Sequence, residues 1–234
     1  GSEMCIRDSD IAFRYIIPVQ GEKRAAVIER ENTAFRFPEG TKITATPQSD
    51  PMIGWKRTKP SYEEYHIVDA PLSQRSQYGR GFTFPVLFNV GGKGDAWALL
   101  SEAGVDGYYC GSRLGDFDGA LFSIEYPMPE ENNGNGTAAP GIALPGKTPW
   151  RTITVGETLA PVVETVVPWS VVEPRYEVAE PARPGKGTWS WLLWQDGSIN
   201  YDDQVRFIDL AAEMGYDNVL VDNWWDRNIG RDRM

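Results

Sequence analysis

The stretch TWSWLLWQDGSINYDDQVRFIDLAAEMGYDNVLVDNWWD, residues 188–226, decides the fold of the end of the chain. Residues 188–194 are almost continuously apolar, which predicts a parallel strand buried on both faces. A second apolar run, Asn218–Val221, predicts another strand. The segment between them has helical periodicity, so the whole stretch predicts a strand–helix–strand unit.

The predicted helix has signals at both ends. Asn200 is a suitable N-cap, and Asp202 and Asp203 follow it in the first turn, where the helix dipole favours negative charge. Gly215 suits the position just after the last helical residue. The apolar residues that recur at helical spacing, and therefore predict the buried face, are Val205, Ile208 and Ala212.

Residues 10–178 have a different pattern, in which short apolar or alternating runs are separated by Gly and Pro. The sequence GGKG, residues 91–94, lies between two such runs and predicts a hairpin. The β-branched run Val162–Val167 also predicts a strand, and no helical periodicity of useful length is present. A β-sandwich is therefore expected, with strands at Ile11–Val19, Ala25–Glu31, Thr41–Thr46, Gly81–Val90, Asp95–Ser101, Ala120–Tyr126 and Trp150–Val155.

The domain organisation follows from these patterns. We expect residues 1–9 to be non-native, because Gly1–Ser2 resembles a cloning scar and Met4–Ser9 resembles a translated sequencing adapter. Residues 10–178 form the β-sandwich domain, and residues 179–187, rich in Pro and Gly, form a linker. Residues 188–234 begin a second domain.

Composition excludes several classes of function. The formal net charge is −10 and no run of Lys and Arg is present, so no nucleic-acid partner is expected. No stretch of about twenty apolar residues exists, so no membrane partner is expected either. The sequence contains 2 cysteines, and they form neither a disulfide framework nor the spacing of a metal site.

Aromatic and acidic residues gather near the ends of the two predicted strands at 188–226. Trp191 lies in the first strand, and Asp222, Trp224 and Trp225 follow the second. In an α/β barrel the carboxyl ends of the strands carry the active site. A carboxylate beside indole rings suits a sugar, because the acid accepts hydroxyl hydrogen bonds and a ring packs on the pyranose face. The alternative is a capping Asp with core tryptophans.

The motifs of this chain resemble those of glycoside hydrolase family 97. The stretch 188–226 resembles the start of that family's catalytic barrel. The upstream segments GWKRTKPSYEEY (54–65), RSQYGRGFTFPVLF (75–88), ALLSEAGVDGYYCGSRL (98–114) and PGKTPWRTITVG (145–156) resemble its N-terminal domain. The resemblance implies a mainly β fold, with an N-terminal β-super-sandwich followed by the first βαβ unit of a truncated (β/α)8 barrel.

The resemblance also implies an activity. Family members are calcium-dependent, exo-acting α-glucosidases or α-galactosidases of the bacterial periplasm that act on oligosaccharides, with either an inverting or a retaining outcome. One calcium ligand comes from the N-terminal domain, and the best match here is Glu102, with Glu63 and Glu64 as alternatives. His66, the single histidine, is expected to be structural or at the surface, and Arg113 to form an ordinary salt bridge.

The catalytic carboxylates of the family come from later barrel strands, so no residue of this chain is assigned as acid, base or nucleophile. We therefore expect a fragment that lacks a signal peptide and does not hydrolyse glycosides by itself. Two alternatives remain open from the sequence: a non-catalytic carbohydrate-binding module, and a structural β-domain that braces the barrel.

Overall fold

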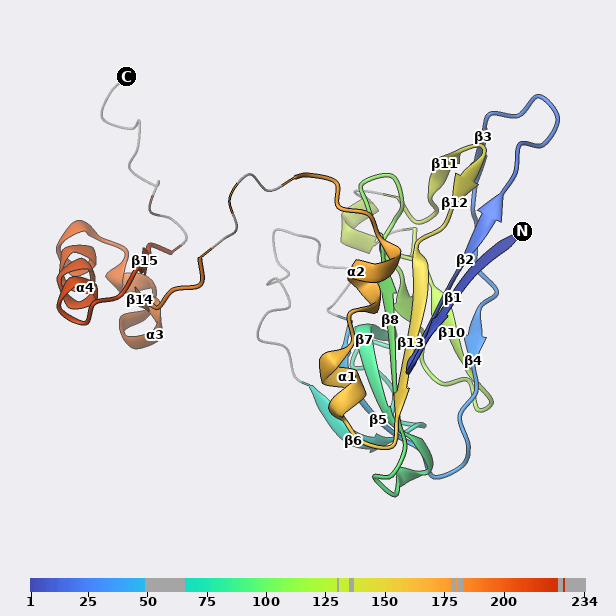
Figure 1. Ribbon diagram of the computed structural model, residues 1–234, viewed down its shortest axis with the longest axis horizontal. Coiled ribbons are helices and arrows are strands. Elements are labelled where there is room, and N and C mark those ends of the chain that lie inside the picture. Colours follow the sequence, from blue (N-terminus) through green and yellow to red (C-terminus); the bar gives the residue numbers. More distant parts are fainter. Residues whose placement is uncertain are drawn as a thin grey trace. The chain divides into compact units, whose positions relative to one another are not determined.

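The computed structural model describes residues 1–48, 66–129, 131–134, 137–177, 180, 183–222 and 225. The chain divides into two compact units, Gly1–Arg175 and Tyr176–Met234. The first unit is built almost wholly from strands, and the second contains the strand–helix–strand segment (Figure 1). The described residues include no helix long and apolar enough to cross a membrane.

The first unit is dominated by one sheet, in which 11 strands are described and every pairing is antiparallel. The main path runs β1 (Ser2–Arg7), β2 (Asp10–Ile17), β13 (Trp150–Gly156), β8 (Trp97–Ala103), β7 (Phe82–Asn89), β9 (Arg113–Leu114), β10 (Phe122–Glu125) and β4 (Ala34–Phe35). Beside this path lie β5 (Lys42–Pro47), β6 (Ile67–Pro71) and β12 (Gly146–Lys147), while β3 (Ala25–Val27) pairs separately with β11 (Gly141–Ala143).

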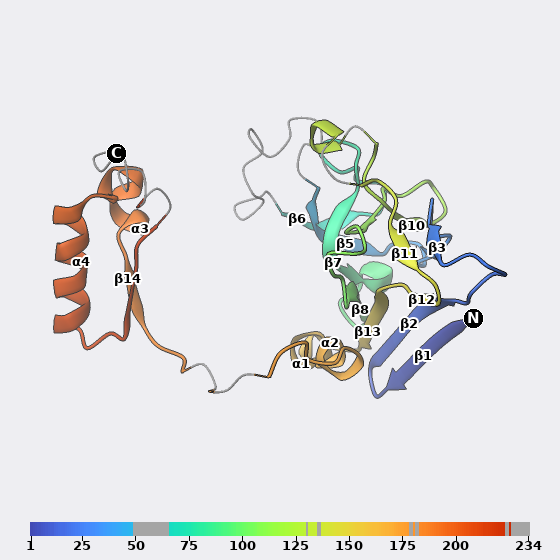
Figure 2. The same cartoon turned by 90° about the horizontal axis from the view of Figure 1, so that it is seen from above.

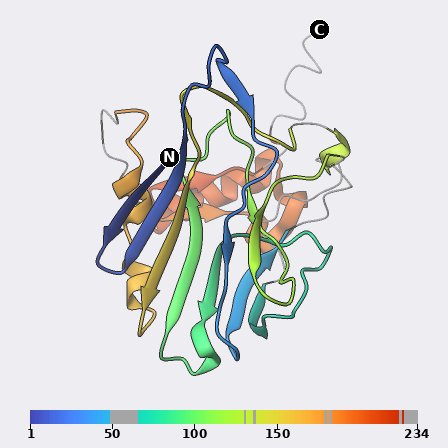
Figure 3. The same ribbon diagram turned by 90° about the vertical axis from the view of Figure 1, so that its right-hand side faces the viewer.

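The sheet curls at β7, which pairs with β5 along one edge and has a different partner at each end of the other edge. Its second half pairs with β8, whereas Phe82 at its start pairs with Leu114 of β9. The strands after β9 therefore turn back over the others, and Phe122 of β10 meets Phe88 of β7 edge to face, with ring centroids 5.5 Å apart. Figure 3 shows the neighbouring strands of this curled sheet. The buried core lies inside the curl, and its largest members include Phe82, Phe88, Phe122 and Leu100.

The alternation of residues along β8 and β13 separates the two faces of the sheet. Leu100 lies opposite Ile153 and faces the main core, whereas Trp150 lies opposite Ala103 and faces the other side. Two short helices, α1 (Ala160–Glu164) and α2 (Val167–Val171), cover that other side (Figure 2). A mainly β fold is thus confirmed.

The strand predicted at Val162–Val167 is wrong, because this segment belongs to α1 and α2. Pro161 and Pro168 lie in the first turns of the two helices, where the fixed φ of proline fits and its missing N–H costs nothing. The β-branched run is therefore divided: Val167 is buried against Trp150, while Val163 is 81% exposed.

The other predicted strands are present, with shorter bounds for most of them. Strands β2, β3, β5, β7, β8, β10 and β13 correspond to the seven expected runs. The predicted hairpin is also confirmed: β7 and β8 pair antiparallel around a 3-10 turn at Val90–Gly92 (η2). The segment 1–9, expected to be non-native, contains β1, which pairs with β2 along its whole length.

The second unit contains the predicted strand–helix–strand arrangement. Strands β14 (Gly187–Trp189) and β15 (Asn218–Leu220) are parallel, and helix α4 (Tyr201–Glu213) connects them and packs on them. The predicted cap is confirmed, since Asn200 Oδ1 accepts a hydrogen bond from the Asp203 N–H at 3.0 Å. Gly215 has a φ of +64° just past the helix end, as its position predicts.

Two details of this unit differ from the prediction. The strand ends at Trp189, and the remaining apolar run forms a helical turn, α3 (Trp191–Trp194), followed by a 3-10 turn, η4 (Gln195–Ser198). Ser190 lies at this change of direction: it is fully buried, and its carbonyl accepts hydrogen bonds from the Leu193 and Trp194 N–H groups. An apolar run this short does not distinguish a strand from a helix.

The buried face of α4 also differs from the predicted one by one residue. The predicted positions Val205, Ile208 and Ala212 are not buried, and Ile208 is 48% exposed. The packing around β14 decides this rotation, because the Thr188 hydroxyl donates to the Phe207 carbonyl at 3.0 Å. The residues that are buried are Gln204, Phe207 and Ala211.

Candidate functional site

Glu102, the predicted metal ligand, lies near the end of β8 on the face that carries the main core. Ala98 and Leu100 precede it on that face and are buried. The side chain of Glu102 is 16% exposed, so the row of core residues ends in a partly accessible carboxylate. The strand thus holds this carboxylate at the border between the core and solvent.

Arg151 is the main partner of Glu102. The two residues are opposite each other in the register of β13 and β8, and Arg151 Nη1 donates to Glu102 Oε2 at 2.7 Å. Ser112 completes a triangle, since its hydroxyl donates to the same Oε2 at 2.5 Å and accepts from Arg151 Nη1 at 2.7 Å. One oxygen of Glu102 is therefore fixed by two donors.

Arg151 is in turn bound by a second carboxylate, Glu31. Arg151 Nε donates to Glu31 Oε1 at 3.0 Å and Nη2 donates to Oε2 at 2.6 Å, a bidentate pair. The side chains of Arg151 and Glu31 are 1% and 4% exposed. Burial acts to lower the pKa of Arg151, but the hydrogen bonds and charges of Glu31 and Glu102 outweigh it and raise that pKa. The guanidinium is therefore permanently charged.

A calcium ligand is predicted at Glu102, and its surroundings can be compared with what that cation requires. Calcium takes six to eight oxygen ligands, and a carboxylate such as Glu102 is a suitable donor. Its Oε1 accepts no hydrogen bond from the described residues, while Oε2 is occupied. However, no three His, Cys, Asp or Glu side chains of the described residues gather closely enough to hold a metal. Glu102 thus fits as one ligand, and the alternatives Glu63 and Glu64 lie outside the described residues.

The two other residues singled out from the sequence have structural partners. Arg113 forms a buried salt bridge, in which Nη2 donates to Glu131 Oε1 at 2.7 Å and Oε2 at 2.6 Å. His66 Nδ1 is hydrogen-bonded to the Thr46 hydroxyl at 2.8 Å in an exposed position. Both expectations are therefore confirmed, and neither residue touches Glu102.

Sequence reasoning missed Arg151, Glu31 and Ser112. A charged residue within the β-branched run WRTITV, residues 150–155, is a usable signal, because an arginine on a core-facing position needs a partner. Its partners come from distant parts of the sequence, so their identity depends on the strand register.

The second unit brings together two of its predicted sugar-binding residues through Trp189, which was not assigned a role. Trp189 Nε1 donates to Asp222 Oδ2 at 3.0 Å, and its ring stacks on that of Trp191 with centroids 5.5 Å apart and planes 20° apart. Trp191 Nε1 donates to Asp196 at 2.8 Å. Trp225 is 62% exposed and, within the described part of the chain, makes no ring contact with Trp191. Trp224 lies outside the described residues.

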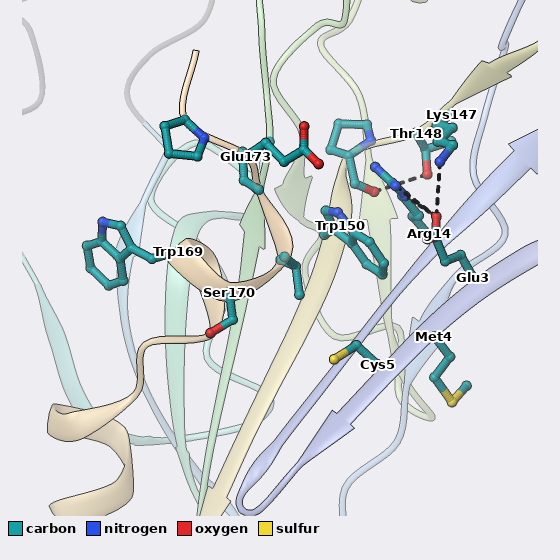
Figure 4. A pocket seen from close by; sticks show the side chains of 15 residues that line it. Glu3, Met4, Cys5, Arg14, Lys147, Thr148, Trp150, Trp169, Ser170 and Glu173 are labelled. Atoms are coloured by element: carbon teal, nitrogen blue, oxygen red, sulfur yellow. Dashed lines mark hydrogen bonds and ion pairs between the residues drawn. The ribbon is translucent and has the colours of Figure 1, made fainter. Parts of the chain in front are cut away.

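A separate cavity of about 730 Å³ lies in the first unit, beside α2 (Figure 4). Trp150 lines it, and because Trp150 and Arg151 are neighbours on β13, this is the side of the sheet away from Glu102. Arg14 lies 4.2 Å above the Trp150 ring and pairs with Glu3 at 2.8 Å. These interactions hold the polar groups of the cavity to each other, and none of the predicted site residues lines it.

Comparisons with known proteins identify relatives of this chain. Residues 3–174 match the family model described as Glycosyl-hydrolase 97 N-terminal. A curated protein of Streptomyces bingchenggensis (strain BCW-1), named "Probable retaining alpha-galactosidase", is 26% identical over 224 residues, which are 94% of this chain and 30% of that protein.

Solved structures are similar as well. The crystal structure of a beta-arabinopyranosidase is 61% identical with a TM-score of 0.89, covering 100% of this chain and 37% of that one. A Glycoside Hydrolase Family 97 enzyme from Pseudoalteromonas sp. strain K8, in complex with acarbose, is 20% identical with a TM-score of 0.70, covering 95% of this chain and 32% of that one. The chain therefore spans about a third of the length of these relatives.

Proposed function

Because the chain belongs to the glycosyl hydrolase 97 family, we propose that it is the N-terminal part of a calcium-dependent, exo-acting glycoside hydrolase that acts on oligosaccharides. The observation that carries this proposal is the environment of Glu102. A carboxylate at the border of the core has one oxygen fixed by Arg151 and Ser112, and its other oxygen accepts no hydrogen bond from the described residues. Oε1 is not among the buried unpaired atoms of the described residues, so it is accessible from solvent to a cation.

Glu102 is the proposed ligand for calcium, through Oε1. The remaining oxygen ligands are proposed to come from elsewhere in the complete protein, because calcium requires several. When bound, the cation would assist departure of the leaving group by stabilising the negative charge that develops on it. The contribution of this chain is to hold Glu102 in one orientation on a rigid strand.

The proposed substrate is a pyranoside with an axial 4-hydroxyl. The beta-arabinopyranosidase is 61% identical to this chain, and the Streptomyces relative bears the name of an alpha-galactosidase. β-L-Arabinopyranose has the ring stereochemistry of α-D-galactopyranose without its hydroxymethyl group, so one kind of site accepts both. An α-glucoside is the alternative, since the Pseudoalteromonas structure contains acarbose.

The second unit is proposed to begin a (β/α)8 barrel, with Trp191, Asp222, Trp224 and Trp225 contributing to sugar binding. The parallel pairing of β14 and β15 supports this, as does the Trp189–Trp191 stack beside the Asp222 carboxylate. This 234-residue chain by itself is proposed to be inactive, since it spans about a third of its relatives. A periplasmic location remains a proposal from the resemblance alone.

The experiment compares the complete protein with its Glu102→Gln variant on p-nitrophenyl β-L-arabinopyranoside, α-D-galactopyranoside and α-D-glucopyranoside, with calcium and after chelation. We expect hydrolysis of the first two, loss of it on chelation, and a higher calcium requirement in the variant. Unchanged calcium dependence in the variant would instead support a purely structural β-domain. Calorimetry with residues 1–178 alone tests the carbohydrate-binding alternative, for which sugar binding is required.

A further inference from the structure

We propose that Glu31 is a positioning residue that sets the calcium affinity of Glu102 by neutralising the guanidinium of Arg151. This inference rests on the proposed role of Glu102. Glu31 itself makes no hydrogen bond or ion pair with Glu102. Its effect therefore passes through Arg151, which contacts both carboxylates.

The geometry divides the guanidinium between the two carboxylates. Glu31 takes the Nε and Nη2 edge in a bidentate pair, and only Nη1 remains for Glu102 and Ser112. A guanidinium is rigid and planar, so fixing one edge fixes the direction of the remaining nitrogen. Glu31 thereby determines where Arg151 holds Glu102 Oε2.

The positive charge of Arg151 must be compensated by Glu31 if Glu102 is to bind a cation. Arg151 Nη1 is 2.7 Å from Glu102 Oε2, so an uncompensated guanidinium would cancel the charge that attracts calcium. Solvent screens little at this position, because Arg151 and Glu31 are both almost fully buried. With Glu31 present, the three side chains carry one net negative charge, and this charge is available at Glu102.

A purely structural role for Glu31 gives a different expectation. In that case a change at Glu31 would lower the stability of the sandwich and leave the calcium affinity of the folded protein unchanged. The Arg113–Glu131 pair provides a matched control, since Glu131 also binds one buried arginine through both of its oxygens. Arg113 makes no hydrogen bond or ion pair with Glu102, whereas Arg151 does, so the two glutamates differ in whether their arginine contacts the proposed ligand.

The test is calcium titration calorimetry on the complete protein after removal of metal with a chelator. We expect Glu31→Gln to raise the Kd for calcium about tenfold or more, the range typical of residues that support a metal ligand. Glu131→Gln should leave the Kd unchanged. Melting temperatures in chelator report the structural effect of each substitution separately. Equal Kd values for the Glu31 and Glu131 variants overturn the proposal.

A double variant tests charge compensation, and it keeps the proposal testable if the Glu31→Gln variant does not fold. Replacing Glu31 by Gln and Arg151 by Met removes both charges, so neither is left buried without its partner. Its calcium Kd should return toward that of the unsubstituted protein, and a Kd as weak as that of Glu31→Gln overturns charge compensation. If instead Glu102→Gln leaves calcium binding intact, the proposed ligand itself is wrong.

Discussion

Arg151 Nη1 lies 2.7 Å from Glu102 Oε2, and the two residues face each other across β13 and β8. The ion pair stands at the end of a row of core residues, so the same strand that builds the core also presents the proposed metal ligand. Stability of the first unit and the orientation of Glu102 therefore depend on one guanidinium.

Replacing Arg151 with Met should destabilise the first unit by about 3–5 kcal/mol, because it leaves Glu31 buried without its charged partner. Urea unfolding followed by near-ultraviolet circular dichroism measures this loss. Arg75→Met is the control: Arg75 is 71% exposed, and its partner Asp116 keeps hydrogen bonds from the N–H and hydroxyl of Ser76. The control should change stability by less than about 1 kcal/mol. A loss equally small for Arg151→Met would contradict the buried geometry.

A second prediction concerns the curl of the sheet at β7. Gly81 has a φ of +78°, and a Cβ there would lie 2.1 Å from the Leu114 carbonyl oxygen, so Gly81→Ala must displace the β7–β9 junction. Gly94→Ala is a matched control, because Gly94 has a φ of +77° and no atom within 4 Å of the added Cβ. Gly94→Ala should lower the free energy of unfolding by about 1–2 kcal/mol, which is the conformational penalty alone. Gly81→Ala should lower it clearly more. Equal losses in urea unfolding would mean that the close approach is absent.

The N-cap of α4 gives a third prediction. Asn200→Ala removes the acceptor of the Asp203 N–H and should destabilise the helix by about 1 kcal/mol. Hydrogen exchange of the α4 amides, measured by mass spectrometry, should then be several-fold faster, since about 1.4 kcal/mol corresponds to tenfold in an opening equilibrium. Asn200→Ser keeps a capping oxygen and should exchange like the unsubstituted chain. Unchanged exchange in Asn200→Ala would rule out the cap.

The sequence predicts elements whose signals are local. The cap at Asn200, the C-terminal Gly215 and the β7–β8 hairpin each depend on a few neighbouring residues, and all three are present. The strand predicted at 162–167 is absent and the one predicted at 188–194 ends at Trp189, because apolar runs this short do not distinguish a strand from a helix. Prolines occupy the first helical turns in the first case, and buried Ser190 lies where the strand ends in the second.

The candidate site is less accessible to sequence reasoning. Resemblance points to Glu102, but its partners Arg151 and Ser112 are 49 and 10 residues away in the sequence. Glu31, the second partner of Arg151, lies 120 residues before it. No local pattern specifies such pairings, because they follow from the strand register and from the curl of the sheet. The local signals of the site are the row of β8 residues that changes from apolar to acidic at Glu102 and the arginine within the β-branched run at 150–155.

A fourth prediction concerns pH. The backbone N–H groups of Leu121 and Ala120 donate to Asp118 Oδ1 at 2.9 and 2.8 Å and hold the pKa of this carboxyl below its usual range. A lowered pKa in the folded state means that the charged form stabilises the fold above the unfolded value, about 3.9. This stabilisation is lost as the pH falls through the lower, folded value.

Asp118→Asn keeps an acceptor for both N–H groups but does not titrate, so it isolates the charge. We expect the unsubstituted chain to have the higher urea midpoint at pH 6, and the difference between the two chains to shrink steadily below pH 4. The comparison is made at each pH, because other acidic groups titrate equally in both chains. A difference that stays constant from pH 6 to pH 3 would show that the two N–H groups do not favour the charged carboxylate.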